Sequence, residues 1–384
     1  MLQLTDKHNC CGCEACAQRC PCKCITMQQD IEGFLYPQID LTLCTNCGLC
    51  EKTCPIINLP HSQKSKQVLA AKIKDNDILL KSSSGGIFSL IAEYILQQNG
   101  IVFGAKFNDK WEVIHDYTEN SDNLDEFRRS KYVQSRIGES FKKTEKFLKS
   151  GKLVLFTGTP CQINGLKLYL KKEYENLYTI SIACHGVPSP KIWNLYLNEI
   201  ITTNPNMYIS SINFRDKTNG WTNYRFKLEL HSTSCDQQTC IQMNYRDNIF
   251  MKAFLQNLIL RPSCEDCKIK IHKNLSDITI GDLWGVSETY PELGSELGIS
   301  FLLINTNKGE LLLNKLNVEK HTIDLNKIRI YNGGLLNKFQ PHKDREVYFK
   351  NLSKMKKFSC YTNRFVQITF ITKLKNKFRQ YLKK

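Results

Sequence analysis

The chain has 384 residues, of which 41% are hydrophobic, 10% aromatic and 23% charged. This composition is typical of a folded protein with two or three domains and excludes a disordered or fibrous chain. The formal net charge is +16, but residues 341–384 alone hold 13 basic and 2 acidic side chains. A nearly neutral body with a basic end favours a docking segment over a nucleic-acid-binding surface. No apolar run could cross a bilayer and the first residues show no signal sequence, so a cytoplasmic protein is expected.

Eighteen cysteines are unusual for a reducing compartment, and eleven of them fall within residues 10–54. The spacing C-x2-C-x2-C-x3-C-P occurs twice there, as in bacterial ferredoxins that bind two 4Fe-4S clusters. In that pattern three cysteines of each repeat bind one cluster, and the fourth, which precedes proline and is expected to start a helix, binds the other. The predicted ligands are Cys10, Cys13, Cys16 and Cys54 for the first cluster, and Cys44, Cys47, Cys50 and Cys20 for the second.

Three cysteines of this segment, Cys11, Cys22 and Cys24, are left without a role. Zinc is the alternative metal, but closed zinc sites usually draw two cysteine pairs from well-separated hairpins. Between the repeats, β-forming residues around Gly33 and Pro37 predict a short hairpin. Residues 1–62 are therefore expected to form an α+β, ferredoxin-like two-cluster domain, which ends in a polar linker at 56–68.

An α/β pattern follows the linker. Apolar residues recur at helical spacing over 86–99, before a stop at Gly100, and the turn Ser82-Ser83-Ser84-Gly85-Gly86 precedes this predicted helix. Hydroxyls, glycines and free amides at a helix start suit a phosphate group, whereas a serine N-cap is an equally good interpretation. The chain contains neither a Walker motif nor GxGxxG, so a Rossmann nicotinamide site is not expected.

Two further strand-to-helix turns carry cysteines. A strand at 152–156 leads to Cys161, and a strand at 178–183 leads to Cys184, after which Ser189-Pro190 begins a helix. Both cysteines then lie at the carboxyl edge of the sheet, where ligands bind in open α/β folds. Cys264 and Cys267 follow in RPSCEDC, before a β-like segment at 277–285. Four thiols from three loops could hold a third cluster; the alternatives are isolated buried cysteines, or zinc at the C-x2-C pair.

The strand pattern is lost after residue 340, and 341–384 is expected to be a basic helical tail. Contact of this tail with an anionic membrane or an acidic partner is one interpretation, which makes the protein membrane-peripheral, and a plain solvated helix is the other. The apolar residues that share one face of the expected helix are Ile371, Leu374, Phe378 and Tyr381.

Several ordered motifs accompany the doubled cysteine repeat. They are SSSGGIF (82–88), SKYVQS (130–135), LFTGTPCQINGL (155–166), CHGVPSP (184–190), FRDKTNGW (214–221), LRPSCEDC (260–267) and DITIGDLWG (277–285). Together they resemble the coenzyme F420 hydrogenase/dehydrogenase beta-subunit family. The resemblance implies that residues 63–340 form an α/β flavin-binding domain with a mixed sheet, and that its four cysteines bind a third 4Fe-4S cluster.

The resemblance also implies that FAD contacts the serine–glycine turn and the loop that follows residue 158. Lys131 or Arg129 is expected to offset the charge of the FAD pyrophosphate, and His185 is a candidate proton donor or, alternatively, a residue that only orients a ligand. The candidate FAD-binding residues are Ser83, Ser84, Gly85, Gly86, Lys131, Thr159 and Gln162.

The expected function is an iron–sulfur flavoprotein oxidoreductase. It would pass electrons between ferredoxin or another redox protein, the clusters, FAD and a two-electron small-molecule substrate such as F420, because flavins exchange one or two electrons. Relatives with basic tails resemble proteins of surface-polysaccharide assembly. The alternative is an electron-transfer subunit or adaptor that serves a partner enzyme and has no substrate of its own.

Overall fold

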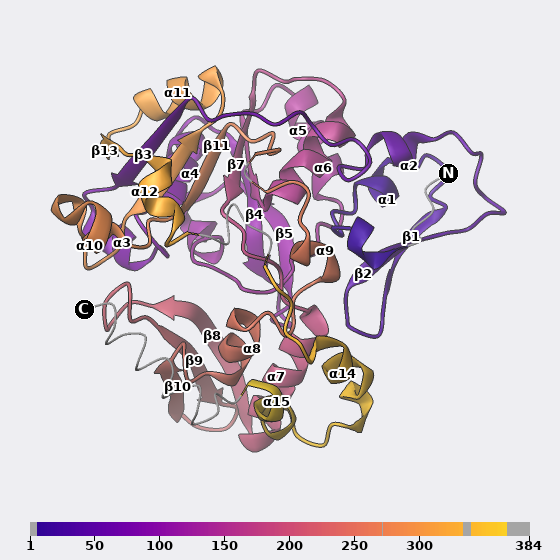
Figure 1. Cartoon of the computed structure of the whole chain (residues 1–384), viewed down its shortest axis with the longest axis vertical. Coiled ribbons are helices and arrows are strands. Elements are labelled where there is room, and N and C mark those ends of the chain that lie inside the picture. Colours follow the sequence, from indigo (N-terminus) through magenta and orange to yellow (C-terminus); the bar gives the residue numbers. More distant parts are fainter. Residues whose placement is uncertain (1–5, 271, 333–338, 367–384) are drawn as a thin grey trace.

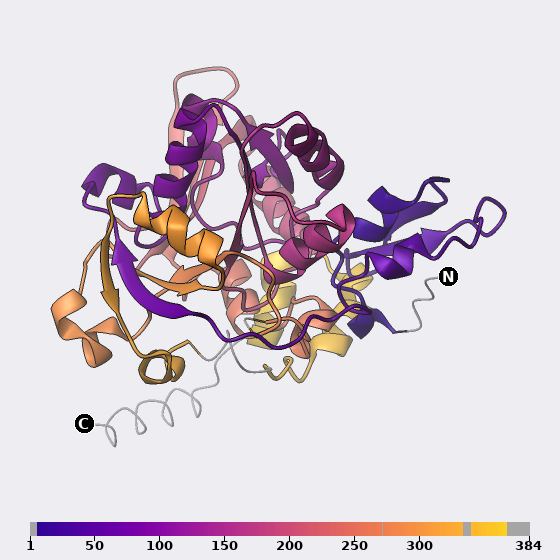
Figure 2. The same ribbon diagram turned by 90° about the horizontal axis from the view of Figure 1, so that it is seen from above.

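The computed structural model describes residues 6–270, 272–332 and 339–366. Its N-terminal region lies to one side of the rest of the chain, where α1 packs against α6 and α5 (Figures 1 and 2). The predicted hairpin is confirmed, with Ile25 opposite Ile39 in an antiparallel pair. This region consists of η1 (Lys7–Asn9), α1 (Ala15–Arg19), β1 (Ile25–Gln29), β2 (Leu35–Ile39) and α2 (Leu49–Lys52).

The largest element is an eight-stranded sheet in the order β13-β3-β12-β11-β7-β6-β4-β5. Strands β4, β6, β7 and β11 are parallel to one another, and the remaining pairs are antiparallel, so the predicted mixed sheet is confirmed. The strands are β3 (Gln67–Lys72), β4 (Ile101–Phe107), β5 (Val113–Thr118), β6 (Val154–Gly158), β7 (Leu177–Ile182), β11 (Ile278–Asp282), β12 (Ser300–Ile304) and β13 (Glu319–Thr322).

Helices cover both faces of this sheet. Apolar side chains of α4 and α11 pack into one buried cluster, and those of α5 and α6 pack into another, with the strands between them. The helices of this body are α3 (Asn76–Leu80), α4 (Ile87–Gln97), η2 (Ser121–Glu126), α5 (Ser140–Lys149), α6 (Pro160–Leu170), α10 (Val286–Thr289), η3 (Pro291–Leu293), α11 (Asn307–Asn314) and α12 (Leu325–Arg329).

A second body below the large sheet in Figure 1 is built on a three-stranded antiparallel sheet, in the order β10-β9-β8. The predicted helix after Ser189 is confirmed: it starts at Pro190, and Ser189 Oγ accepts a hydrogen bond from Ile192 N. The elements here are α7 (Pro190–Thr203), β8 (Met207–Asp216), β9 (Arg225–Ser232), β10 (Gln238–Asn244), α8 (Ile249–Leu255), α9 (Pro262–Glu265), α14 (Arg345–Lys350), η4 (Leu352–Lys354) and α15 (Phe358–Val366).

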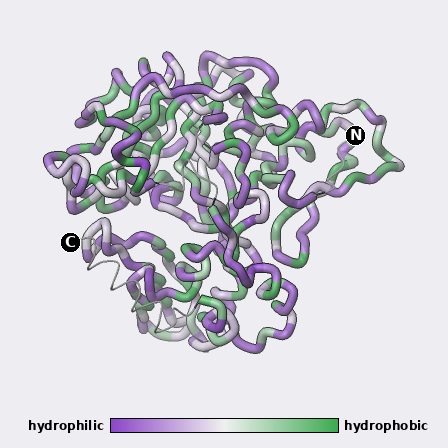
Figure 3. The backbone as a smooth tube through the Cα atoms, viewed as in Figure 1, coloured by the Kyte–Doolittle hydropathy of each residue, from purple (hydrophilic) through white to green (hydrophobic). Residues whose placement is uncertain are grey.

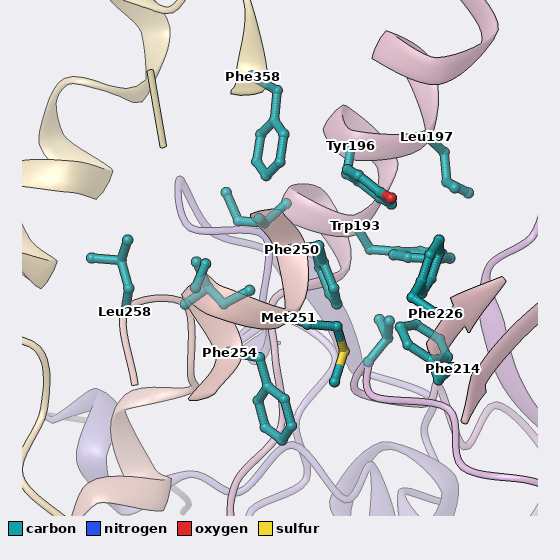
Figure 4. Close-up of a cluster of buried hydrophobic side chains, with 14 of the residues drawn as sticks. Trp193, Tyr196, Leu197, Phe214, Phe226, Phe250, Met251, Phe254, Leu258 and Phe358 are labelled. Atoms are coloured by element: carbon teal, nitrogen blue, oxygen red, sulfur yellow. The ribbon is translucent and has the colours of Figure 1, made fainter. Parts of the chain in front are cut away.

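The described part of the expected basic tail is packed into this second body. Tyr348, Phe349, Phe358 and Val366 are buried in the same apolar cluster as α7 and β9, and Figure 4 shows Phe358 beside Tyr196. Residues 345–366 therefore stabilise the core through burial. The apolar face predicted for Ile371, Leu374, Phe378 and Tyr381 lies outside the described residues.

Hydrophilic residues predominate on the outer loops, and hydrophobic residues on the inner strands and helices (Figure 3). In the ranges that the structure describes, no helix is both long and apolar enough to cross a membrane.

Trp193 of α7 lies at the centre of the second core (Figure 4), with its ring centroid 5.0 Å from those of Phe214 and Phe250. We expect Trp193→Ala to lower the free energy of unfolding by about 3–5 kcal/mol, because it leaves a cavity among close-packed rings. Urea denaturation measures the change. Tyr208→Ala, at a side chain that is 51% exposed, is the matched control and should change the free energy by about 0.5 kcal/mol or less. Equal losses in both variants would contradict this packing argument.

Candidate functional site

The predicted ligands of the first cluster gather around α1. Burial, followed by the charges of Cys10 and Cys54, raises the pKa of Cys16 to about 12. Interaction with Cys11 lowers the pKa of Cys13, but burial together with the charges of Cys54 and Cys16 outweighs it, so the net shift is upward. The four thiols are thus close enough to repel one another as thiolates. Iron relieves such repulsion by coordinating the deprotonated thiols, so this donor set fits a 4Fe-4S cluster.

Each N-terminal helix lies before the fourth cysteine of its repeat. Helix α1 ends at Arg19, and Cys20 has an extended backbone with φ −67° and ψ 115°. Helix α2 likewise ends before Cys54. The prediction that the fourth cysteine starts a helix is therefore wrong, because a residue before proline is biased away from the helical conformation.

The second group of thiols includes one that the sequence left without a role. Cys24 is buried, and its Sγ lies 3.3 Å from Cys20 Sγ. A hydrogen bond to Cys20, followed by burial, raises the pKa of Cys24 to about 12, and Cys44 contributes in the same direction. Cys47 and Cys50 lie before and within α2. In the described parts of the chain, no three His, Cys, Asp or Glu side chains converge as a single metal ion would require.

The four cysteines predicted for a third cluster line one cavity. Cys161 is the second residue of α6 and Cys184 follows β7, so the adjacent parallel strands β6 and β7 bring the two together at their carboxyl ends. Cys264 and Cys267 reach the same cavity from α9 and the turn after it. An isolated antiparallel bridge between Pro188 and Leu260 joins the two loops.

These thiols also interact with one another. Burial, and then the charges of Cys264 and Cys161, raise the pKa of Cys184 well above its usual value. Burial and the charge of Cys267 raise the pKa of Cys264 to about 12. Thr159 Oγ1 lies 3.2 Å from Cys161 Sγ. Four mutually repelling thiols around one cavity fit the same kind of cluster as the first N-terminal group.

Cys11, another cysteine without a predicted role, lines this cavity too. Interaction with Cys13 raises the pKa of the Cys11 thiol and interaction with Cys161 lowers it, so Cys11 lies between the first N-terminal group and the cavity of the body. The one feature of the sequence that could have indicated a role for Cys11 is its position directly after the predicted ligand Cys10.

A larger cavity of about 610 Å³ adjoins the cysteine cavity. This volume is within the usual range for small-molecule and cofactor sites. The two cavities share a wall, and its residues are Thr159, Gln162, Cys184, His185, Gly186 and Val187.

His185 stands in this shared wall. Its Nε2 lies 2.6 Å from Asn257 Oδ1, and its ring stacks on Phe339 at a centroid distance of 5.1 Å. Burial lowers the pKa of His185, and the bond to Asn257 opposes that shift. The lowered pKa favours a neutral imidazole near neutral pH, which suits the predicted orienting role, and the role of proton donor stays a prediction.

The serine–glycine turn borders the large cavity through Ser83, Ser84 and Gly86, and α4 begins directly after it. The interpretation of the serines as N-caps is wrong: Gly86, with φ +78°, occupies the N-cap position, and no side chain caps the helix. Ser83 Oγ accepts a hydrogen bond from Ser130 N (2.7 Å), and Ser84 Oγ donates one to Ile299 O (2.7 Å). No side chain caps the amides of the first helical turn, and binding of an anion by them stays a prediction.

Gly85 differs from its neighbours. It is absent from the residues that line the cavity, and its amide donates to Ser300 Oγ at 3.0 Å. A Cβ at Gly85 would lie 2.3 Å from Ala71 O, so this glycine allows the turn to pack on β3 and β12. Its predicted place among the FAD-binding residues is corrected to a structural role.

Lys131, Thr159 and Gln162, the other candidate FAD-binding residues, all line the large cavity. Lys131 Nζ donates to Arg128 O at 2.8 Å, and burial lowers the pKa of Lys131 to about 7. Gln162 Oε1 accepts from Thr159 N at 2.9 Å, which fixes the start of α6. Gln162 is therefore a helix-capping residue as well as a wall residue.

Further wall residues were not found from the sequence. Tyr224 and Tyr245 stack at a centroid distance of 4.2 Å and line the cavity with His115. Burial lowers the pKa of His115 to about 4. These side chains come from separate strands and loops, so no local spacing in the sequence marks them.

Asp282, Trp221 and Trp284 form one contact group. Trp221 is buried, stacks on Trp284 at 4.7 Å, and donates through Nε1 to Asp282 Oδ1 at 3.2 Å. Asp282 also pairs with the fully buried guanidinium of Arg215 at 2.5 Å. Trp221 thus has a packing role, whereas Trp284 and Asp282 border the cavity.

These features define a class of protein, namely a mixed α/β chain with an N-terminal iron–sulfur region. A model of the 4Fe-4S binding domain matches residues 37–56, and a model of the C terminus of the coenzyme F420 hydrogenase/dehydrogenase beta subunit matches residues 151–330. Together with the two relatives below, these matches support the coenzyme F420 hydrogenase/dehydrogenase beta-subunit family, with 4Fe-4S binding in the N-terminal region.

The names of two curated relatives both refer to coenzyme F420. The coenzyme F420-dependent sulfite reductase of Methanocaldococcus jannaschii is 22% identical over 355 residues, which cover 89% of this chain and 51% of the relative. A subunit of the F420H2 dehydrogenase of Methanosarcina mazei is 24% identical over 198 residues, which cover 47% of this chain and 54% of the relative. The chain thus spans about half the length of the curated relatives it matches.

A solved structure of the F420-reducing [NiFe] hydrogenase complex from Methanosarcina barkeri contains a similar chain. The two chains share 18% sequence identity with a TM-score of 0.46, and the match covers 77% of this chain and 96% of the other.

Proposed function

We propose that this protein is an iron–sulfur flavoprotein oxidoreductase that moves electrons between a ferredoxin-type redox protein and a two-electron small-molecule substrate. F420 is one such substrate. The observation that carries the proposal is the wall shared by the cysteine cavity and the large cavity, because it would hold a cluster and a flavin next to each other. When bound, clusters supply one-electron transfer and FAD supplies the conversion between one and two electrons.

The chain's own residues bind and orient these groups in the proposal. The twelve predicted cysteines would hold three clusters, and the amides after Gly86 together with Lys131 would bind the FAD pyrophosphate. Ser83 and Ser84 fix this turn through their hydrogen bonds to other loops. The aromatic side chains of Tyr224, Tyr245 and Trp284 form an apolar wall that suits a flat ring, since aromatic rings favour offset stacking.

An electron-transfer subunit without its own substrate is the second candidate. It is favoured by the relative that is named as a subunit of a dehydrogenase. In that case a partner enzyme would accept electrons from the same clusters, and the basic C-terminal residues or the N-terminal region would contact it. The two candidates differ in one measurable property, which is the presence of tightly bound flavin.

The test is the metal and flavin content of protein prepared without oxygen. We expect about twelve iron atoms, a matching amount of sulfide and about one FAD per chain, because three four-iron clusters and one flavin are proposed. Colorimetric iron and sulfide analysis and flavin absorption measure these amounts. About eight iron atoms would remove the third cluster, full iron without flavin would favour the electron-transfer role, and zinc without iron would contradict both.

A further inference from the structure

Arg261 lies between residues 10–13, called the N-terminal cysteine loop below, and the cysteine cavity of the body. Its side chain is completely buried. It is the residue directly before α9, three positions before Cys264. Its backbone N–H donates to Val187 O at 3.0 Å, which fixes it to the loop that carries Cys184. None of the roles assigned above involves this residue.

Two nitrogens of the guanidinium bond the N-terminal region directly, and the third bonds it through Gln134. Nε donates to Cys10 O at 2.8 Å, Nη2 donates to Leu35 O at 3.0 Å, and Nη1 donates to Gln134 Oε1 at 3.0 Å. Gln134 Nε2 in turn donates to Cys11 O at 3.1 Å. The planar fork of arginine is suited to several fixed acceptors at once, and lysine would not replace it.

The cysteine loop is also shaped around this group. Gly12 has φ +69°, and a Cβ there would lie 2.7 Å from Arg261 Nη1 and 2.7 Å from Gln134 Nε2. The ring of Tyr36 lies 4.3 Å from the guanidinium carbon, and that of Phe34 lies 5.3 Å from it. Any larger residue at Gly12 would push the loop away, so the close approach of loop and guanidinium is built into the sequence.

Among the described residues, Arg261 has no carboxylate within ion-pairing distance, and its hydrogen-bond acceptors are neutral oxygens. The Glu14 carboxylate, which accepts from the backbone amides of Ile137 and Gly138, interacts with it only at longer range. Burying a charge without a direct ion-pair partner is costly, so anions nearby stabilise it. Among the anionic groups that act on Arg261 are Cys10 and Cys11 on the N-terminal side and Cys264 on the body side.

We propose that Arg261 is a positioning residue that fixes the N-terminal cysteine loop against the body cavity and makes the clusters on both sides easier to reduce. The inference rests on the proposed function, because it requires both clusters. Net charge and hydrogen bonds near the ligand sulfurs set the reduction potential of a cluster. A fixed positive charge between the first N-terminal cluster and the body cluster would stabilise the reduced form of each.

Arg345 provides a matched control. It too is buried and joins the N-terminal region to the body: Nη1 donates to Glu32 Oε1 at 3.0 Å, Nη2 donates to Glu32 Oε2 at 2.6 Å, and Nη2 also donates to Leu260 O at 2.7 Å. Its charge is balanced by Glu32, and Glu265 lies 3.6 Å away. The loss of Arg345 therefore removes a connection between the same two parts of the chain and also leaves Glu32 unpaired.

The experiment is a redox titration of the anaerobic, cluster-loaded protein, in which electron paramagnetic resonance measures the reduced fraction of each cluster at each potential. We expect Arg261→Gln to lower the reduced-to-oxidised ratio of the first N-terminal and body clusters roughly tenfold at a fixed potential, about 59 mV for one electron. The second N-terminal cluster, whose predicted ligands are not among the described contacts of Arg261, should keep its potential. Gln134→Glu should lower the same two potentials while Arg261 remains, because it places a carboxylate of equal size on the guanidinium.

Arg345→Gln should leave the ratios within about threefold of wild type. Unchanged potentials in Gln134→Glu would overturn the inference, as would equal shifts of all clusters or the same pattern of shifts in Arg345→Gln. Amide hydrogen exchange of residues 10–13, faster in Arg261→Gln, reports the positioning role separately. Iron and flavin analysis of the wild type comes first: a missing body cluster contradicts the proposed function, whereas a full set with unmoved potentials contradicts only this inference.

Discussion

Cys184→Ala is expected to remove one cluster and to leave the other two, so iron should fall from about twelve to about eight atoms per chain. Cys184 lies in the wall between the two cavities, and the charges of the three other predicted ligands of the body cluster act on it. Its loss therefore leaves that cluster with three ligands. Reduction of flavin by a ferredoxin-type donor should slow by more than about 100-fold, beyond the 10–100-fold effects seen for residues that only support metal ligands. Iron analysis and anaerobic stopped-flow absorption measure both effects.

Cys360→Ala is the matched control, because Cys360 is an exposed thiol on α15 and lies outside the predicted ligand sets. It should keep about twelve iron atoms and the wild-type rate of flavin reduction. If Cys184→Ala keeps all its iron, the assignment of the body cluster is wrong. If it loses all iron while Cys360→Ala keeps it, the three sites do not fill independently.

The N-terminal region was predictable because its information is local. Spacing of the cysteines marked the two groups of thiols, and β-forming residues marked the hairpin that the structure confirms. Whether each helix lies before or after the fourth cysteine of its repeat was not predictable from the spacing alone. Cys20 shows the reason. The proline after it favours an extended backbone at Cys20, which ends the preceding helix.

The closeness of Cys161 and Cys184 was predictable from the way parallel strands are arranged in a sheet. Both follow strands, and neighbouring parallel strands end at the same edge. The rule gave no information on Cys264 and Cys267, which reach the cavity only because the bridge between Pro188 and Leu260 closes a loop over 70 residues long. Here the family resemblance supplied what periodicity could not.

The roles of single residues between separate segments were the least predictable part. Gly85 was grouped with its neighbours, yet its amide bonds Ser300, 215 residues away in sequence. Arg261 was overlooked because a single buried charge produces no repeating pattern in the sequence. Its partners Cys10, Leu35 and Gln134 are also distant in the chain. Such roles depend on tertiary contacts, which override local pattern.

Binding of FAD is expected to weaken as the pH rises above about 7, and Lys131 is the cause. In the ligand-free cavity, burial, assisted by the charge of Arg129, lowers the pKa of Lys131 to about 7. A bound pyrophosphate favours the protonated ammonium, so binding takes up a proton whenever the lysine is neutral beforehand. By linkage, the affinity should fall by up to about tenfold for each pH unit above 7, and by up to about 100-fold at pH 9.

Fluorescence titration of FAD against the apoprotein from pH 6 to 9 measures this dependence. Lys131→Arg keeps its charge throughout the range and should bind FAD with little change between pH 7 and 9, whereas Lys131→Met should show weak binding at every pH. Unfolding cannot imitate the effect: the lysine of the unfolded chain still holds its proton between pH 7 and about 10, so through Lys131 the ligand-free protein gains stability as pH rises. A pH dependence in Lys131→Arg equal to that of the wild type would assign the proton to another group and contradict the pyrophosphate contact at Lys131.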